Sequence, residues 1–296
     1  MKVKFWGVRG SIAVPGESTL KYGGNTTCIE VRTDDNDLII LDAGTGIFPL
    51  SHTLLANMPV EANIFISHTH WDHIQGLPFY IPIFVPGNTL KIHGAFDPIS
   101  QQDIRRVISQ QLEHCYFPVR EPELSASLEY ITLREFQSVK IGENTTVTNI
   151  FMNHPVLNFG YRIDCNGKSL FFTGDHEEWF NIYEPGEPGF EDYQVHMEAR
   201  NKQMVDFIRN VDVLVMDTSY TIDEYPAKAG WGHGTYDSSI RTGREAGAKK
   251  LFFTHHEPTR TDALLEKVYN EALKRNPPQP GDPEFLLARE GLEYEW

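Results

Sequence analysis

Seven consecutive residues carry an unusual density of side chains that can bind metal ions. The segment Ser67-His68-Thr69-His70-Trp71-Asp72-His73 contains three histidines and one aspartate. Imidazole and carboxylate groups are good ligands for zinc and for harder transition metals. At a turn from a strand into a helix, His68 and His70 can face one ion, whereas Asp72 and His73 can face a second. The spacing therefore predicts a centre with two metal ions.

The elements that would position these ligands are short apolar runs, each of which stops at a polar residue. Runs of this kind, bounded by turn residues, predict buried strands. We expect the ends of six such strands to line one rim of the fold. The runs are Leu38 to Leu41 before Asp42, Ile64 to Ile66 before Ser67, Val147 to Met152 before Asn153 and His154, Leu170 to Phe172 before Thr173-Gly174-Asp175, Val211 to Met216 before Asp217, and Leu251 to Phe253 before Thr254-His255-His256.

Segments with helical spacing of apolar residues lie between and after these strands. The pattern predicts helices over residues 47–57, 98–114, 192–210, 236–246 and 261–275, and a final short strand over 284–287. This alternation indicates an α/β protein with two mixed sheets covered by helices. The acidic stretch from Glu177 to Glu191, rich in proline and glycine, is expected to be a surface loop or a lid. No boundary interrupts the chain, so we predict a single domain over residues 1–296.

The pattern His-x-His-x-Asp-His after an apolar strand resembles the signature of the metallo-β-lactamase-fold hydrolases. The other polar strand ends follow in the order of that family: a lone histidine in Phe151-Met152-Asn153-His154, an aspartate in Thr173-Gly174-Asp175 and a late histidine in Thr254-His255. The resemblance extends from Phe5 to about Asp262. It implies a four-layer αββα sandwich with the metal site at one rim.

The resemblance also implies a ligand set and two divalent ions, zinc before manganese or iron. One ion would be bound by His68, His70 and His154, the other by Asp72, His73 and His255, with Asp175 bridging both. His255 matches the Thr-His of the family, but the adjacent His256 stays open as the ligand. Asp42 ends a strand beside the metal loop, and metal-bound imidazoles usually donate their second N–H to a carboxylate or carbonyl. We therefore expect Asp42 to support a ligand.

The stretch Trp231-Gly232-His233-Gly234-Thr235 is similar to the phosphodiesterase branch of this family, which includes RNase Z and cyclic phosphodiesterases. That branch implies that His233 assists proton transfer, and His233 and Asp72 are the predicted catalytic residues. RNase Z carries a long basic arm for tRNA, whereas residues 177–210 here are short and acidic, which argues against tRNA processing. Arg9, in a glycine-rich turn, is a candidate contact for an anionic substrate.

The composition sets further limits. The chain has 296 residues, 40% of them apolar, and a net charge of −15. This apolar content excludes a disordered protein, and no run reaches the ~18 to 20 apolar residues of a membrane span. Three widely spaced cysteines and no secretory signal predict a cytoplasmic protein without disulfides. The acidity argues against nucleic acid as a partner, because a nucleic-acid surface needs clustered Lys and Arg.

These observations predict a dinuclear metal-dependent hydrolase. The favoured activity is hydrolysis of a small phosphodiester, including cyclic nucleotides, by a hydroxide that bridges the metals. The alternatives are a hydrolase for another ester, lactone or thioester, a nuclease, and a non-catalytic sensor that binds a nucleotide. The sequence leaves open the physiological substrate, the identity of the metals, whether the chain forms a homodimer and the role of the loop over 177–191.

Overall fold

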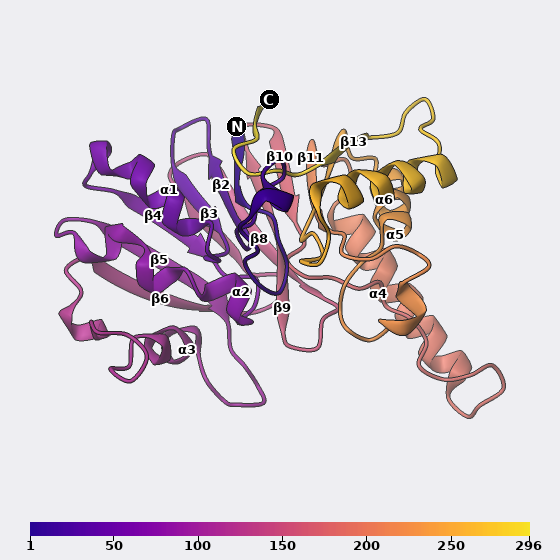
Figure 1. Ribbon diagram of the computed structural model, residues 1–296. Helices are drawn as coiled ribbons and strands as arrows, with labels where there is room; N and C mark the ends of the chain where they lie inside the picture. Colours follow the sequence, from indigo (N-terminus) through magenta and orange to yellow (C-terminus); the bar gives the residue numbers. More distant parts are fainter.

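Two seven-stranded sheets pack face to face in the computed structural model, which describes residues 1–296 (Figure 1). In spatial order, the first sheet contains β14 (Glu293–Glu295), β1 (Lys2–Gly7), β2 (Cys28–Arg32), β3 (Leu38–Leu41), β4 (Glu61–Phe65), β5 (Thr89–Ala95) and β6 (Ser127–Leu133). The second sheet contains β13 (Glu284–Leu287), β12 (Lys250–Thr254), β11 (Val213–Asp217), β10 (Lys168–Phe172), β9 (Asn158–Cys165), β8 (Thr145–Met152) and β7 (Ser138–Ile141).

Helices cover both outer faces of this pair of sheets (Figure 1). The first sheet is covered by α1 (Ile47–Leu54), α2 (Trp71–Ile74) and α3 (Ile104–Gln111), and the second by α4 (Phe190–Phe207), α5 (Tyr236–Ala246) and α6 (Asp262–Arg275). Short 3-10 helices occupy residues 17–19, 55–57, 77–79, 81–84, 121–123 and 225–227. This architecture confirms the predicted αββα sandwich. None of the helices combines the length and apolar character needed to cross a membrane.

Burial on both faces explains why the central strands read as continuous apolar runs. Strands β3 to β6 are parallel, as are β10 to β13, and parallel strands are covered on both sides. Leu41, Phe65 and Phe172 fill the space between the sheets, whereas Ile40 and Leu214 pack against the outer helices. Complete burial of each such side chain contributes roughly 1.5–3 kcal/mol.

The direction of the strands brings the polar strand ends together. Because β3 and β4 run parallel, Asp42 and the segment after Phe65 leave the first sheet at the same end. In the second sheet β10, β11 and β12 are parallel. Strand β9 is antiparallel to both of its neighbours, β8 and β10, so β8 points in the same direction as β10. Open α/β sheets bind ligands outside the carboxyl ends of their strands, so this rim is the place to look for chemistry.

The boundaries of most helices agree with the sequence pattern, with one informative exception. The helix expected over residues 98–114 is shorter, because α3 begins only at Ile104. The Asp103 side chain accepts a hydrogen bond from the Arg106 backbone N–H and so caps the helix. Residues 98–103 form a turn before this cap.

Candidate metal centre

Seven side chains from both sheets converge at the rim. Their ligand atoms form two groups of four, and within each group all atoms lie within 4.8 Å of one another. We call these groups the outer cluster and the inner cluster. The outer cluster consists of His68, His70, His154 and Asp175, and the inner cluster consists of Asp72, His73, Asp175 and His255.

Asp175 is shared because its two carboxylate oxygens face different clusters. Oδ2 lies 3.5 Å from His68 Nε2 and 3.9 Å from His154 Nε2. Oδ1 lies 3.2 Å from Nε2 of both His73 and His255. Burial alone would raise the pKa of this carboxyl, but His255, His73 and His68 hold the pKa well below its usual range. Asp175 is therefore an anion placed between two sets of imidazoles.

The donor set fits two divalent cations. His68 Nε2 and Asp175 Oδ1 are buried and have no hydrogen-bond partner in the chain. Buried polar atoms without a partner are uncommon, and each needs an explanation such as a bound ion. Groups of imidazole nitrogens and carboxylate oxygens are the ligands that zinc, manganese and iron accept. A cation in each cluster would give these two atoms the partners that they lack.

Local backbone geometry directs the inner ligands into the site. Asp42 and His255, each of which follows a strand, have positive φ angles of 61° and 57°. Such left-handed conformations are uncommon for residues other than glycine and gather at functional sites. Gly10 makes room for one of these ligands, because a Cβ at Gly10 would come within 2.2 Å of the His255 ring. The next residue, Ser11, donates its backbone N–H to Asp72 Oδ2 at 2.7 Å.

Carboxylates hold the imidazoles of the inner cluster. His73 Nδ1 donates to Asp42 Oδ2 at 2.7 Å, so Nε2 is the atom left for a metal. Asp42 is fully buried and also accepts hydrogen bonds from Ser67. His255 Nδ1 lies 3.0 Å from Ser219 Oγ, which donates to Asp217 at 2.8 Å. Contacts of this kind fix the tautomer of a ligand and increase its basicity.

In the outer cluster, two imidazoles contact a backbone carbonyl and the Ser67 hydroxyl, which itself donates to Asp42 at 2.8 Å. His154 Nδ1 donates to the Gly232 carbonyl at 2.9 Å, and His68 Nδ1 lies 3.1 Å from Ser67 Oγ. Gly232 has a φ angle of 87°, and a Cβ there would come within 2.3 Å of His154 Nδ1. Only glycine allows this close approach without strain.

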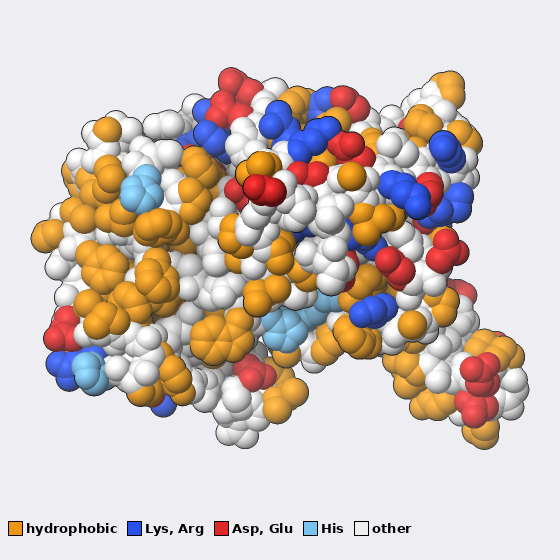
Figure 2. Space-filling view, viewed as in Figure 1, with side chains coloured by type: hydrophobic (Ala, Val, Ile, Leu, Met, Phe, Trp, Pro, Cys, Tyr) orange, Lys and Arg blue, Asp and Glu red, His pale blue; other side chains and the backbone are white.

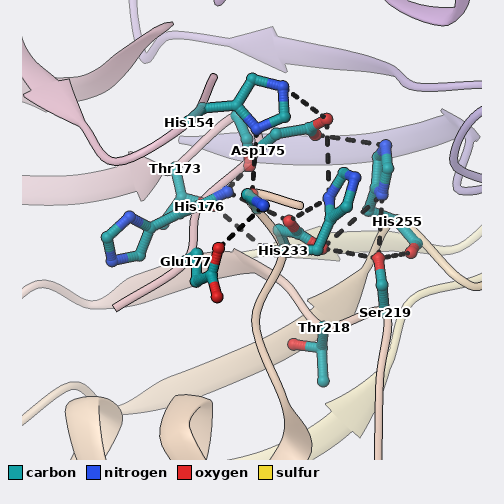
Figure 3. A network of polar contacts seen from close by, with 12 residues as sticks. His154, Thr173, Asp175, His176, Glu177, Thr218, Ser219, His233 and His255 are labelled. Atoms are coloured by element: carbon teal, nitrogen blue, oxygen red, sulfur yellow. Dashed lines mark hydrogen bonds and ion pairs between the residues drawn. The ribbon is translucent and has the colours of Figure 1, made fainter. Parts of the chain in front are cut away.

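His233 stands beside both clusters (Figure 3). Its Nδ1 donates to Asp217 Oδ2 at 2.9 Å, and its ring stacks on His255 with centroids 4.8 Å apart. Burial lowers the pKa of His233, but Asp217 together with Asp175 and Asp72 outweighs this effect and raises the pKa to about 9. His233 Nδ1 also belongs to a third group of close ligand-type atoms with Asp175, Asp217 and His255. Because Asp217 occupies Nδ1, Nε2 is the atom of His233 that is free to react.

Two residues that the sequence analysis considered for the site, Arg9 as a substrate contact and His256 as an alternative ligand, lie in the interior away from the clusters. Arg9 is fully buried, and its guanidinium donates to the carbonyls of Gly23 and Arg260 at 2.8 Å. A side chain with no exposed surface cannot meet a substrate directly. His256 donates from Nε2 to the Ala288 carbonyl at 2.8 Å and belongs to neither cluster.

Glu177 was missed by the sequence analysis, which assigned it to a surface loop. The structure corrects this, because Glu177 is only 2% exposed. Its carboxylate accepts hydrogen bonds from the backbone N–H groups of Gly230 and Gly232 at 2.9 and 2.8 Å and from the Tyr225 hydroxyl at 2.6 Å. Glu177 therefore holds the loop that carries the carbonyl bonded to His154 and, one residue later, His233.

The rest of the predicted loop does lie outside the body. Residues 178–189 are irregular and mostly exposed, and with the first turns of α4 they project from the second half of the molecule (Figure 1). This projection carries hydrophobic and acidic side chains (Figure 2). Between Lys168 and Arg200 the chain has no Lys or Arg.

Comparison with known proteins agrees with the fold. Residues 38–256 match the family described as Beta-lactamase superfamily domain. The chain is 23% identical to a protein named Ribonuclease Z from Thermoplasma acidophilum, with 92% of each chain covered.

Several solved structures align over the whole chain, and two of them illustrate the similarity. The metallo-beta-lactamase fold protein YhfI from Bacillus subtilis aligns with a TM-score of 0.66 at 20% identity, over 98% of its own length. A diphosphatase from the PhnP family aligns with a TM-score of 0.65 at 17% identity, over 97% of its length. The family match covers most of the chain, and it confirms the predicted family and the predicted class of metal-dependent hydrolase. The chain belongs to the beta-lactamase superfamily.

Proposed function

We propose that the protein is a phosphodiesterase that uses two divalent metal ions and acts on a small phosphodiester. The observation that carries this proposal is the pair of four-ligand clusters joined by Asp175, with one carboxylate oxygen directed to each. Two ions held there would supply Lewis-acid activation of a water nucleophile and would neutralise charge on the phosphoryl group. Zinc is the first candidate, with manganese and iron as alternatives, because His and Asp ligands accept all three.

The side chains around the clusters supply proton transfer and orientation. Asp217 holds the His233 ring through Nδ1, which leaves Nε2 free to donate a proton to the leaving oxygen. Proton donation by a positioned histidine typically accelerates a reaction by about 10²- to 10⁴-fold. Asp42, Ser219 and the Gly232 carbonyl keep the second nitrogen of three ligands occupied. The ligands can therefore keep their orientation during turnover.

Charge supports a small substrate over a structured RNA. The net charge is −15, and the projecting segment before and in α4 contains no Lys or Arg before Arg200. Binding to an RNA backbone requires basic side chains that displace counterions. The similarity to proteins named Ribonuclease Z weakens the argument against a nucleic-acid substrate. RNA is therefore the second candidate substrate.

One set of measurements tests the proposal. The purified protein, reconstituted with zinc or manganese, should contain two ions per chain and hydrolyse methyl p-nitrophenyl phosphate and cyclic nucleotides. Precursor tRNA should be processed much more slowly than these small diesters. Less than one ion per chain would contradict the dinuclear site, and equal rates on precursor tRNA would replace the small substrate with RNA. Hydrolysis of a lactone, thioester or sulfate ester without any diester activity would favour another hydrolase.

A further inference from the structure

A hollow beside the outer cluster has the chemistry of a binding site for a flat, uncharged ring. It has a volume of about 290 Å³ and lies between α2 and α3. Its walls include two aromatic rings, Trp71 and Tyr116, and the aliphatic side chains of Ile74 and Val107. The polar part of the wall is uncharged and includes Thr69 and Gln111.

Two residues of the metal motif, Thr69 and Trp71, line the hollow. Thr69 and Trp71 alternate along the chain with the ligands His68, His70 and Asp72. The indole of Trp71 is 66% exposed, although a side chain of this size usually buries most of its surface. In Figure 2, histidine side chains reach the surface between the two halves of the molecule, with hydrophobic side chains next to them. An exposed indole joined directly to a metal ligand can stack on a group attached to the reacting phosphate.

Gln111 provides an independent observation. It is the last residue of α3 and only 8% exposed, and neither its amide nitrogen nor its amide oxygen has a hydrogen-bond partner in the chain. Leaving a buried donor and acceptor unpaired is unfavourable. A ligand edge that offers an acceptor beside a donor would satisfy both atoms. Nucleobases have such edges, and glutamine recognises them through paired hydrogen bonds.

The absence of charge narrows the ligand class. No Lys, Arg, His, Asp or Glu lines the hollow, so it offers no opposite charge to a second phosphate or to an ammonium group. Its volume is at the lower end of the roughly 300–1,000 Å³ of sites for small molecules, so it suits one ring system and not a whole substrate. Aromatic stacking with an amide at the ring edge is how proteins hold unpaired bases.

We propose that the hollow between α2 and α3 is a nucleobase subsite, so that the protein prefers a nucleoside phosphodiester. Trp71 stacks on the base and Gln111 reads its edge. This inference rests on the proposed phosphodiesterase function, whose metal clusters would hold the attached phosphate. A second hollow of about 220 Å³, beside His154, also has aromatic walls, including Phe180, but Glu177 and His154 contribute charged or titratable groups to it.

The test compares two esters with the same leaving group. They are adenosine 5′-(p-nitrophenyl phosphate) and methyl p-nitrophenyl phosphate, and the measured quantity is the ratio of their kcat/KM values. The ratio cancels any change in the metal centre that affects both esters. In Trp71→Ala the ratio should fall by about tenfold to a hundredfold, and Trp71→Phe should restore most of it. Gln111→Leu, which keeps the size of the side chain, should lower the ratio roughly tenfold.

Matched variants and a binding assay separate the possible outcomes. Phe48→Ala removes an exposed aromatic ring from α1, outside both hollows, and should leave the ratio unchanged. An unchanged ratio in Trp71→Ala and Gln111→Leu overturns the subsite, and a fall only in Phe180→Ala assigns the base to the other hollow. Calorimetric titration with adenosine 5′-monophosphate does not require turnover. If the wild type cleaves neither ester, the proposed function is wrong. The titration still tests the subsite, because Trp71→Ala should bind adenosine 5′-monophosphate more weakly than the wild type, and equal binding would overturn the subsite.

Discussion

The inner and outer clusters use similar ligands but differ in what surrounds them. Every member of the inner cluster is buried, whereas His70 and His154 of the outer cluster are only partly buried. Asp42 contacts an inner imidazole directly, and Asp217 acts on another through Ser219. In the outer cluster His68 reaches Asp42 only through the Ser67 hydroxyl, and His154 has only the Gly232 carbonyl, so no outer imidazole contacts a supporting carboxylate directly.

This difference implies two unequal metal sites. A carboxylate partner strengthens an imidazole ligand, and burial shields the ion from exchange with water. The inner cluster should therefore bind its ion more tightly, and the outer cluster, which adjoins the hollow between α2 and α3, should be the side that meets the substrate. The types of ligand therefore do not decide which site binds its ion more tightly. The groups that bond to the second nitrogen of each imidazole decide it.

Asp175 is the residue whose loss should have the largest effect, because both clusters depend on it. Asp175→Ala should reduce the metal content from two ions per chain to one or fewer. Diester hydrolysis should fall by more than about a thousandfold, beyond the 10–100-fold that is typical for loss of an outer partner. Elemental analysis and turnover assays measure both quantities. Asp164→Ala, at a half-exposed position of β9, is the control, and two ions retained in Asp175→Ala would disprove sharing.

His233→Ala should separate chemistry from metal binding. Both ions should remain, and turnover should fall by about 10²- to 10⁴-fold, the usual range for a general acid. The loss should be smaller for p-nitrophenyl esters than for alkyl diesters, because p-nitrophenolate leaves without a proton. His196→Ala, on the exposed side of α4, is the control. Loss of an ion in His233→Ala would instead make His233 a ligand, as the third group of close atoms allows.

Much of the site could be predicted because its ligands follow short apolar runs that are visible in the sequence. Buried strands of an α/β sandwich are short apolar runs, so their polar ends are visible in the sequence. His154, Asp175 and His255 each follow such a run, and the resemblance to the metallo-β-lactamase-fold family implied that they are ligands. Strands β5 and β6 were not predicted, because charged or polar residues such as Lys91 and Glu129 alternate with their apolar ones.

Long-range contacts explain the misses. Glu177 lies in an acidic stretch rich in proline and glycine, yet it is buried because it accepts hydrogen bonds from Gly230 and Gly232, more than 50 residues later. The only local sign of this contact is the pair of glycines before His233, Gly230 and Gly232, because their backbone can approach another chain segment closely. Arg9 follows a strand near the rim, but its partner carbonyl at Arg260 is 251 positions away. No local pattern separates such a residue from one that meets a substrate.

Asp42→Asn should act mainly on the inner cluster, because Asp42 contacts His73 directly but reaches His68 of the outer cluster only through the Ser67 hydroxyl. The amide of asparagine would face His73 Nδ1 or Ser67 and could not accept both of their hydrogen bonds. The affinity of the tighter site should fall by about 10- to 100-fold, and the affinity of the weaker site should fall by a smaller factor. Competition with a chelator measures the two constants. Asp212→Asn is a matched control, because Asp212 accepts the Ser169 backbone N–H as Asp42 accepts that of Ser67. Asp212 precedes β11 of the second sheet and so lies at the end of the strands away from the metal clusters.

Glu177→Gln should have the smallest effect and should fall on the outer cluster. The two carboxylate oxygens of Glu177 together accept bonds from Tyr225, Gly230 and Gly232, and a glutamine amide nitrogen can accept none of them. The Gly232 carbonyl should then hold His154 less firmly, and the next residue, His233, should be less well placed.

We expect Glu177→Gln to weaken the outer ion by several-fold up to about tenfold, at the low end for an outer partner. Turnover should fall by a similar factor, and the inner ion should be unaffected. Glu178→Gln is the matched control, because Glu178 is half-exposed, pairs with Arg241 and accepts none of the bonds that Glu177 accepts. If Glu177→Gln instead lowers thermal stability while both metal affinities stay unchanged, Glu177 only stabilises the loop. If both sites weaken equally, the two clusters are not independent, and the contrast between them does not arise from their separate partners.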